Sequence, residues 1–130
     1  MTIRVLVADD QKIVRDNIKM MIDKERDINV IAEASDGNEA LALVEKFLPD
    51  VVVMDIIMPK LDGIKATEKL LSQLPTIKIV ALSMYSDKRF VDKMLSMGAM
   101  GYVLKENMVK ELIKAIRSAF NNQIYLSETL

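Results

Sequence analysis

Apolar residues in this chain follow two different spacings. Five short runs are apolar almost throughout and have the length of β-strands, and they cover residues 3–8, 28–34, 51–54, 78–83 and 101–104. The third run shows no polar alternation, which is typical of a strand buried on both faces. Between and after these runs, apolar residues recur every three or four positions. That spacing predicts five amphipathic helices.

Turn and capping residues separate the predicted elements. Asp36 and Asp62 precede the second and third helices and are expected to cap or turn the chain there. Pro49 closes the second helix, because proline disfavours helical backbone in the residue before it. Gly98 suits a left-handed position after the fourth helix, and Asn107 is expected to cap the fifth.

The alternation of strands and helices predicts the fold class. With short connections it indicates an α/β fold, a doubly wound five-stranded parallel sheet with helices on both faces. A length of 130 residues fits a single domain. Ligands of such sheets bind outside the carboxyl ends of the strands. The residues that follow each strand are therefore the ones to examine for function.

Composition narrows the chemistry. The chain has no Cys, His or Trp, which excludes disulfides, thiol nucleophiles and imidazole acid-base catalysis. Its 18 basic and 19 acidic residues nearly cancel, so nothing indicates a nucleic-acid footprint. The sequence shows neither a signal peptide nor an apolar stretch of membrane-spanning length. We therefore expect a cytoplasmic protein with no membrane partner.

Chemistry-bearing residues follow four of the five strands. Asp9 and Asp10 follow the first, Asp55 the third, Ser83 ends the fourth and Lys105 follows the fifth. Each residue alone would be an ordinary cap, loop charge or structural hydroxyl, but together they predict one polar site. Two carboxylates about 4–5 Å apart repel by roughly 3–4 kcal/mol at an effective dielectric near 20. A hard divalent cation would relieve that repulsion, and a site with oxygen ligands only would take Mg²⁺, Mn²⁺ or Ca²⁺.

Several motifs together resemble the receiver domain of two-component response regulators, of the NarL/LuxR type. They are VLVADD at 5–10, PDVVVMDIIMP at 49–59, LDG at 61–63, ALS at 81–83 and GAMGYVLK at 98–105. The resemblance implies a flavodoxin-like fold with strand order 2-1-3-4-5. It assigns residues 1–121 to the receiver domain and 122–130 to a tail or the start of a linker.

The resemblance also implies roles around a metal ion. Asp55 would be the phosphoacceptor, taking a phosphoryl group from the phosphohistidine of a sensor histidine kinase. Asp10, Asp55 and the backbone carbonyl of Ile57 would ligate Mg²⁺ directly, and Asp9 would act mainly through water. Arg15 is expected to be an ordinary solvated charge.

Three further residues would transmit the signal. Lys105 would pair with Asp55 and then with the phosphoryl oxygens, and Ser83 would hydrogen-bond the phosphoryl group. Tyr102 would be an aromatic switch that turns inward into the space Ser83 leaves. The face built from the fourth helix, fifth strand and fifth helix would then repack.

Output is implied to run through other surfaces or domains. A homodimer is expected on phosphorylation, through the first and fifth helices or through the fourth-helix face. DNA would be contacted only by an output domain that this chain lacks, since residues 124–127 resemble the linker before such a domain. We favour an excised receiver over a single-domain regulator.

The sequence departs from the family at two positions near the site. Glu106 stands where many receivers carry proline, which puts the usual cis peptide after Lys105 in doubt. Met84 is bulky where the wider family is often small, and we expect it to narrow access to Ser83.

Three rival interpretations use the same residues. An Asp-nucleophile phosphatase needs a second acid where Ile57 stands. A flavin-binding flavodoxin needs a phosphate loop of small residues where Asp9 and Asp10 stand. A pseudo-receiver would keep the fold without phosphorylation, and the intact acids argue against it. The preferred interpretation is a regulatory domain, not an enzyme, that assists its own Mg²⁺-dependent phosphorylation and dephosphorylation.

Overall fold

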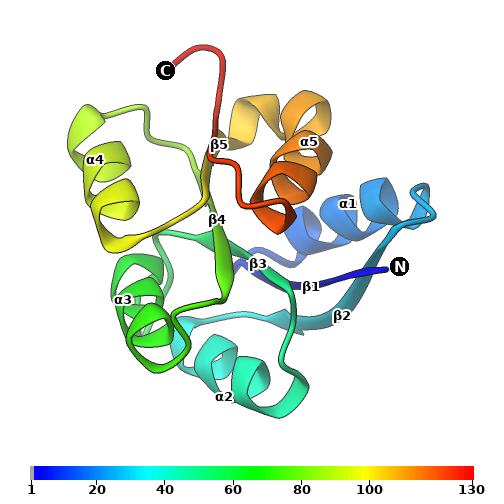
Figure 1. Cartoon of the computed structure of the whole chain (residues 1–130), viewed down its shortest axis with the longest axis horizontal. Helices are drawn as coiled ribbons and strands as arrows, with labels where there is room; N and C mark the ends of the chain where they lie inside the picture. The colour runs from blue at the N-terminus through cyan, green and yellow to red at the C-terminus, as the bar shows by residue number, and fades with distance from the viewer. Residues whose placement is uncertain (1) are drawn as a thin grey trace.

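The computed structural model describes residues 2–130, and strands alternate with helices along the chain (Figure 1). The strands are β1 (Ile3–Ala8), β2 (Ile28–Ala34), β3 (Val51–Asp55), β4 (Lys78–Ser83), β5 (Gly101–Leu104) and β6 (Tyr125–Leu126). The α-helices are α1 (Lys12–Asp23), α2 (Gly37–Phe47), α3 (Gly63–Gln73), α4 (Lys88–Met97) and α5 (Met108–Phe120), with a 3₁₀ turn at Lys105–Asn107.

All strand pairs in the sheet are parallel, in the order β2-β1-β3-β4-β5-β6. The five predicted strands and their order are confirmed. The prediction of five strands was nevertheless one short, because the tail (residues 122–130) adds β6 to the edge of β5. β6 has only two residues, and it forms because β5 offers it an open edge. A two-residue strand has no periodic pattern of its own.

Two apolar layers cover the sheet. One contains buried residues of α2, α3 and α4, and the other contains those of α1 and α5. β3 contributes to both, with Val52 and Met54 in the first layer and Val51 and Val53 in the second. This confirms that β3 is buried on both faces. The central strands are thus fixed from two sides, and their carboxyl ends form a rigid edge.

Most of the predicted boundaries have the expected local cause. The Asp36 and Asp62 carboxylates each accept a hydrogen bond from the backbone amide three residues later, at 2.8 and 2.9 Å. Gly98 takes the left-handed conformation with φ of 107°. The expected cap at Asn107 is wrong, because its side chain makes no capping bond and instead donates to Thr129 Oγ1 at 3.1 Å. Contact with the tail takes precedence over local capping there.

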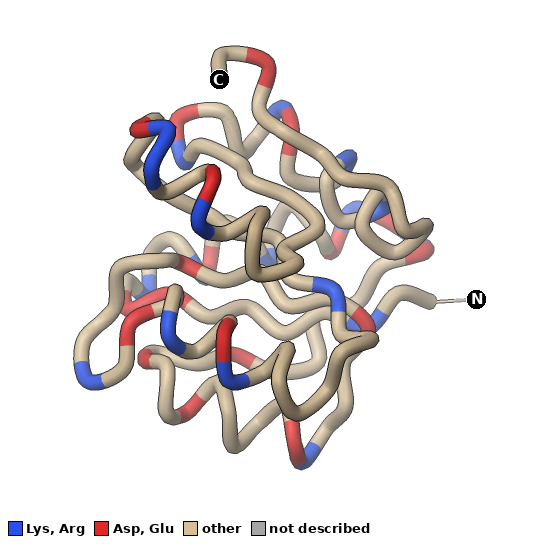
Figure 2. The backbone as a smooth tube through the Cα atoms, turned by 60° about the vertical axis from the view of Figure 1, so that its left-hand side comes forward, with Lys and Arg blue, Asp and Glu red and all other residues tan. Residues whose placement is uncertain are grey.

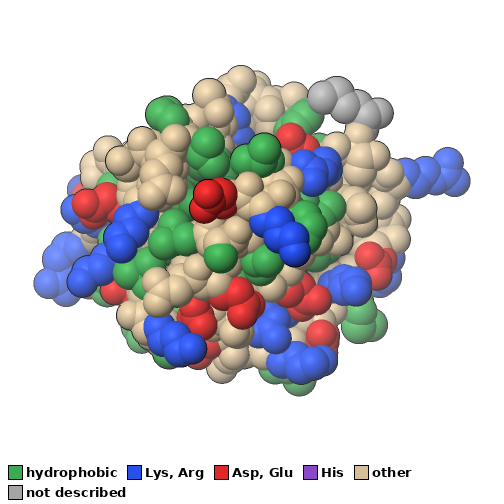
Figure 3. All heavy atoms as spheres, turned by 90° about the horizontal axis from the view of Figure 1, so that it is seen from below, with side chains coloured by type: hydrophobic (Ala, Val, Ile, Leu, Met, Phe, Trp, Pro, Cys, Tyr) green, Lys and Arg blue, Asp and Glu red, His purple; other side chains and the backbone are tan. Residues whose placement is uncertain are grey.

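Charged residues of both signs are interspersed along the chain, as the backbone view shows (Figure 2). On the face seen from below, hydrophobic side chains lie between basic and acidic ones (Figure 3). Within residues 2–130, none of the helices combines the length and apolar character needed to span a bilayer.

Candidate functional site

The carboxyl ends of β1, β3, β4 and β5 meet at one edge of the sheet, and the predicted polar residues meet there. One carboxylate oxygen from each of Asp9, Asp10 and Asp55 lies within 4.8 Å of the others. Lys105 Nζ approaches two of these acids. The sequence therefore located the acidic cluster and its ammonium partner correctly.

Two of the three carboxylates are removed from water. Asp9 is 0% exposed and Asp55 is 4% exposed, whereas Asp10 lies on the surface. Burial, together with the neighbouring Asp9 charge, raises the pKa of Asp55 to about 6. The backbone N–H of Ile57, which donates to Asp55 Oδ1 at 3.1 Å, and the Lys105 ammonium oppose that rise without cancelling it.

Lys105 bridges the two buried acids. Its Nζ lies 2.8 Å from Asp9 Oδ2 and 3.3 Å from Asp55 Oδ2, so it approaches Asp9 more closely than the expected partner, Asp55. Burial acts to lower the pKa of Lys105, but the two carboxylates outweigh it and the pKa lies above its usual value. The cluster thus has three carboxylates and one ammonium, which contacts two of them, so its net charge stays negative.

The cluster has the composition of a hard-cation site. Asp9 Oδ2 is buried and has no hydrogen-bond donor in suitable geometry, even with the Lys105 ammonium nearby. The Lys105 ammonium lies 2.8 Å from this oxygen, but one ammonium does not neutralise three carboxylates, and the remaining negative charge is costly unless a further cation offsets it. Oxygen ligands alone match Mg²⁺ or Mn²⁺. The residues present therefore fit the expected metal.

Backbone contacts hold the acids in place. Arg15 Nη1 donates to the carbonyl oxygen of Asp9 at 2.7 Å, and Arg15 Nε donates to Glu33 at 3.3 Å. The expectation that Arg15 is a solvated charge is wrong. A Cβ on Gly63 would lie 1.9 Å from the carbonyl oxygen of Asp55, so α3 can begin here only with glycine. Nothing in the sequence distinguishes Arg15 from an ordinary surface arginine. Only its position one turn into α1 could have indicated its contact with the Asp9 carbonyl.

Hydrogen bonds connect Ser83 to Tyr102 through the backbone of Tyr85. Tyr85 N donates to Ser83 Oγ at 2.9 Å, and the Tyr102 hydroxyl donates to Tyr85 O at 2.7 Å. The Tyr102 ring is already fully buried while Ser83 bonds Tyr85, so the structure does not show the outward position from which the expected inward turn would start. Ser83 and Tyr102 thus share Tyr85 as a hydrogen-bond partner.

A pocket of about 150 Å³ gives access to the site. It is lined by Asp10, Gln11, Asp55, Ile57, Met84, Tyr85 and Lys105. Met84 belongs to this lining with its side chain largely exposed, whereas Ser83 does not, so the expected narrowing of access to Ser83 stays a prediction.

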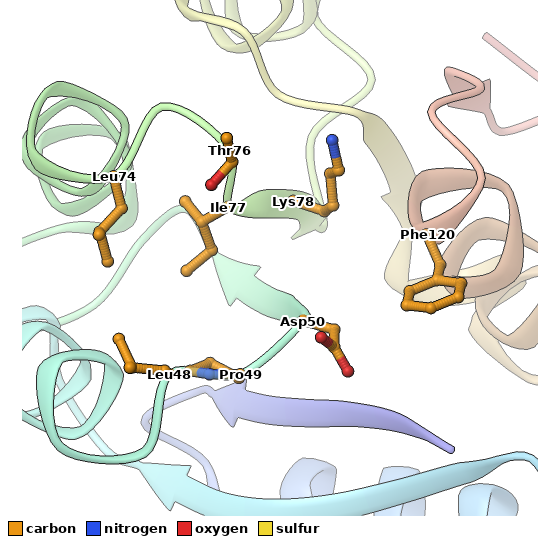
Figure 4. Close-up of a pocket in the computed structure, with 8 residues that line it drawn as sticks. All are labelled: Leu48, Pro49, Asp50, Leu74, Thr76, Ile77, Lys78 and Phe120. Atoms are coloured by element: carbon orange, nitrogen blue, oxygen red, sulfur yellow. The ribbon is translucent and has the colours of Figure 1, made fainter. Parts of the chain in front are cut away.

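A larger pocket, of about 290 Å³, lies at the opposite end of the sheet (Figure 4). Its lining includes Asp50 and Ile77, the residues just before β3 and β4, together with Phe120 of α5. Asp50 already accepts a hydrogen bond from Arg4 N at 2.8 Å. None of the candidate site residues lines this pocket.

Comparison with known proteins gives the family. The sequence matches the response regulator receiver domain over residues 5–117. The chain belongs to this family. The peptide after Lys105 in this receiver domain is trans, as are all peptide bonds within residues 2–130.

Relatives of this receiver domain are transcription regulators. It is 37% identical over 124 residues to the transcriptional regulatory protein DegU of Brevibacillus brevis, covering 95% of this chain and 52% of that protein. It is 42% identical over 117 residues to an uncharacterized transcriptional regulatory protein, YxjL, of Bacillus subtilis, covering 90% and 54%. The chain thus spans about half the length of the curated relatives it matches.

Solved structures agree with this assignment. A LuxR-family response regulator from Aurantimonas superposes with a TM-score of 0.95 at 32% identity, covering 99% of this chain and 92% of that one. The predicted resemblance to NarL/LuxR-type receivers is therefore confirmed. This is a receiver domain of a two-component response regulator, a regulatory signalling domain.

Proposed function

We propose that this receiver domain accepts a phosphoryl group on Asp55 from the phosphohistidine of a sensor histidine kinase. The observation that carries the proposal is the burial of Asp55 beside Asp9, with one ammonium shared between them. Structural acids in a protein interior are normally neutralised by partners, whereas this pair is only partly neutralised. The remaining negative charge would attract a cation, and the cation would in turn bind a phosphoryl group.

The transfer needs no general base. With a pKa of about 6, Asp55 is mostly ionised at neutral pH, so a carboxylate oxygen can attack phosphorus directly. The new O–P bond forms as the N–P bond of the donor breaks, and the donor leaves as neutral imidazole after taking a proton. This explains how a site without His can work.

Asp10, Asp55 and the carbonyl of Ile57 would hold Mg²⁺, with Asp9 acting mainly through water. When bound, the ion would supply positive charge against the phosphoryl oxygens, and Mn²⁺ could replace it. Lys105 would leave the shared position between Asp9 and Asp55 to pair with those oxygens. The chain's own residues thus position the acceptor and offset charge.

Ser83 would carry the first step of the response. Its hydroxyl now bonds the backbone of Tyr85 and would turn to the phosphoryl group. Moving a two-state equilibrium from 1:99 to 99:1 takes about 5.5 kcal/mol, and one charge-assisted hydrogen bond contributes roughly 1.5–3 kcal/mol. The free energy from the Ser83 hydrogen bond is therefore too small alone, and contacts of Lys105, Tyr102 and a partner surface must supply the rest.

Phosphorylation would control dimerisation or an attached transcriptional output domain. The helices α1 and α5 pack on the same side of the sheet, and both expose large apolar side chains, Ile13 at 70% and Met20 at 65% on α1 and Val109 at 78% on α5. They support the first of the two expected interfaces, through α1 and α5. DNA contact would belong to the output domain that the longer relatives suggest, and not to this one.

Intact mass tests the proposal directly. The domain is incubated with acetyl phosphate, with and without Mg²⁺, as wild type, as Asp55→Asn and as Asp50→Asn. We expect one phosphoryl group on the wild type and on Asp50→Asn, only with Mg²⁺, and none on Asp55→Asn. A phosphoryl group on Asp55→Asn would place the acceptor elsewhere. A wild-type protein that neither forms the adduct nor binds beryllofluoride would be a pseudo-receiver.

A further inference from the structure

The tail crosses the face formed by α4, β5 and α5. In Figure 1 it runs beside β5, between α4 and α5, to the carboxyl end of the chain. Tyr125 N donates to Met100 O at 3.1 Å, and Ser127 N donates to Tyr102 O at 3.0 Å. The tail therefore bonds the backbone of the residue whose side chain is the proposed switch.

A side-chain cluster fastens the tail in place. Ser127 Oγ accepts a hydrogen bond from Leu104 N at 2.9 Å and donates one to Glu111 Oε1. Glu128 N donates to the other carboxylate oxygen of Glu111 at 3.0 Å. Glu111 is only 3% exposed and Ser127 only 2%. We call Leu104, Glu111 and Ser127 the latch.

The latch and a neighbouring contact lie on either side of Lys105. Leu104, directly before it, bonds Ser127, and Asn107, two residues after it, bonds Thr129 Oγ1. Leu126 and Leu130 of the tail also line a mainly apolar groove of about 290 Å³ with α4. Residues on both sides of Lys105 in the sequence thus contact the tail.

We propose that the latch holds residues 125–130 on the α4–β5–α5 face and opens when the acidic site takes up a phosphoryl group. The coupling, that is the opening of the latch by a phosphoryl group at the acidic site, rests on the proposed function. The latch itself does not. A phosphoryl group on Asp55 draws Lys105 away from Asp9, and Leu104 moves with it. An N–H···O hydrogen bond normally spans about 2.7–3.2 Å and weakens steeply when its angle falls below about 120°, so a shift of Leu104 weakens its bond to Ser127.

Opening is all-or-none for a physical reason. The Glu111 carboxylate is covered by the tail, and both bonds from residues 127 and 128 satisfy it there. A buried carboxylate that loses a donor is costly, so partial loosening favours complete release, after which water solvates Glu111. Release uncovers the edge of β5. A dimer through the α4 face needs that release, whereas one through α1 and α5 does not.

Amide hydrogen exchange of the tail tests the latch. The variants are Ser127→Ala and Glu111→Gln, and the matched controls are Ser72→Ala and Glu68→Gln at exposed positions of α3. We expect the amides of residues 125 and 127 to exchange at least about tenfold faster in Ser127→Ala, because this variant loses both hydrogen bonds of the Ser127 hydroxyl. Glu111→Gln keeps one acceptor oxygen and should give a smaller increase. Unchanged exchange in Ser127→Ala, or unprotected tail amides in the wild type, would overturn the latch.

Beryllofluoride, a stable phosphoryl mimic, tests the coupling. Its binding is followed by fluorine NMR in Mg²⁺ buffer, and tail exchange is measured in the same samples. We expect bound beryllofluoride to speed tail exchange in the wild type. Because coupling between two sites is reciprocal, Ser127→Ala should bind beryllofluoride about three- to tenfold more tightly than Ser72→Ala.

The outcomes separate the two proposals. Beryllofluoride that binds while tail exchange and affinity stay unchanged would overturn the coupling and leave the proposed function standing. No bound beryllofluoride would overturn the proposed function and the coupling with it. The latch is then still decided by the exchange rates of the unliganded variants.

Discussion

The two ends of the parallel sheet both carry charged residues, but they treat those charges differently. At the amino end, Arg117 joins Glu25 and Asp27 at 2.7 and 2.8 Å, and Asp50 accepts from the backbone of Arg4. At the carboxyl end, Lys105 is shared by two buried acids, and a buried oxygen of Asp9 has no hydrogen-bond donor.

The difference identifies the functional end more reliably than the size of a pocket does. The larger cavity is at the amino end, where the charged groups already have partners. The smaller one, at the carboxyl end, adjoins an incompletely neutralised cluster. Fold stability favours complete neutralisation of buried charges, so an acidic cluster in which one ammonium serves three carboxylates indicates that a ligand completes the set.

The largest expected effect comes from removing the shared ammonium. In metal-free protein at pH 7, Lys105→Met leaves Asp9 and Asp55 buried without a cation, and we expect a loss of about 3 kcal/mol in the free energy of unfolding. Urea denaturation in the presence of a chelator measures it. Lys78→Met, at the amino end, should change stability little, and an equal loss there would erase the contrast between the two ends.

Removing one of the buried acids should instead increase the free energy of unfolding. Because the folded-state pKa of Asp55 is raised to about 6, the ionised form is disfavoured in the folded state and stability falls as pH rises from about 4 to 6. Asp55→Asn should therefore be more stable than the wild type at pH 7 by about 2 kcal/mol without metal. The gain should vanish near pH 4.

Urea denaturation across this pH range checks the effect, with Asp50→Asn as the matched variant at the other end. That variant keeps an acceptor for Arg4 N and should show no such pH-dependent gain. A gain for Asp55→Asn that is independent of pH would contradict the account of the raised pKa.

A smaller effect is expected where the switch hydroxyl is removed. Tyr102→Phe leaves the carbonyl of Tyr85 without its donor and should cost about 1 kcal/mol of unfolding free energy. Tyr85→Phe, at an exposed ring, is the control and should be near neutral. Equal stability of Tyr102→Phe and wild type would mean that this hydrogen bond does not hold the ring inward.

The smallest effect is expected at the paired charges of the amino end. Arg117→Ala removes partly exposed ion pairs, which are screened by salt and contribute little. We expect a slight loss of thermal stability that shrinks as sodium chloride is added. A large, salt-independent loss would show that these ion pairs matter as much as the buried ones.

Much of the fold follows from the sequence, because periodic apolar spacing survives in every long element. The unbroken apolar run of β3 predicts a strand buried on both faces, and the structure confirms it. β6 escaped prediction since two residues carry no period, and its position depends on the open edge of β5. Contacts between distant segments, such as Ser127 with Glu111, leave no local signal.

The site was predictable in its members and less so in its pairings. Acids and a lysine after successive parallel strands must meet, and they do. The closer approach of Lys105 to Asp9 than to Asp55 depends on side-chain packing that a spacing argument does not contain. The same holds for Arg15, which contacts the backbone carbonyl of Asp9 as well as the Glu33 carboxylate.

The most direct test of the central claim is thermal unfolding with and without Mg²⁺ at pH 7. A ligand that binds only the folded state raises Tm, and the increase grows with the ratio of the ligand concentration to its Kd. We predict that Mg²⁺ raises Tm of the wild type and of Asp50→Asn alike, and that the increase is largely lost in Asp55→Asn. An equal increase in Asp55→Asn, or its loss in Asp50→Asn alone, would contradict the claim that the carboxyl end of the sheet is the cation and phosphoryl site.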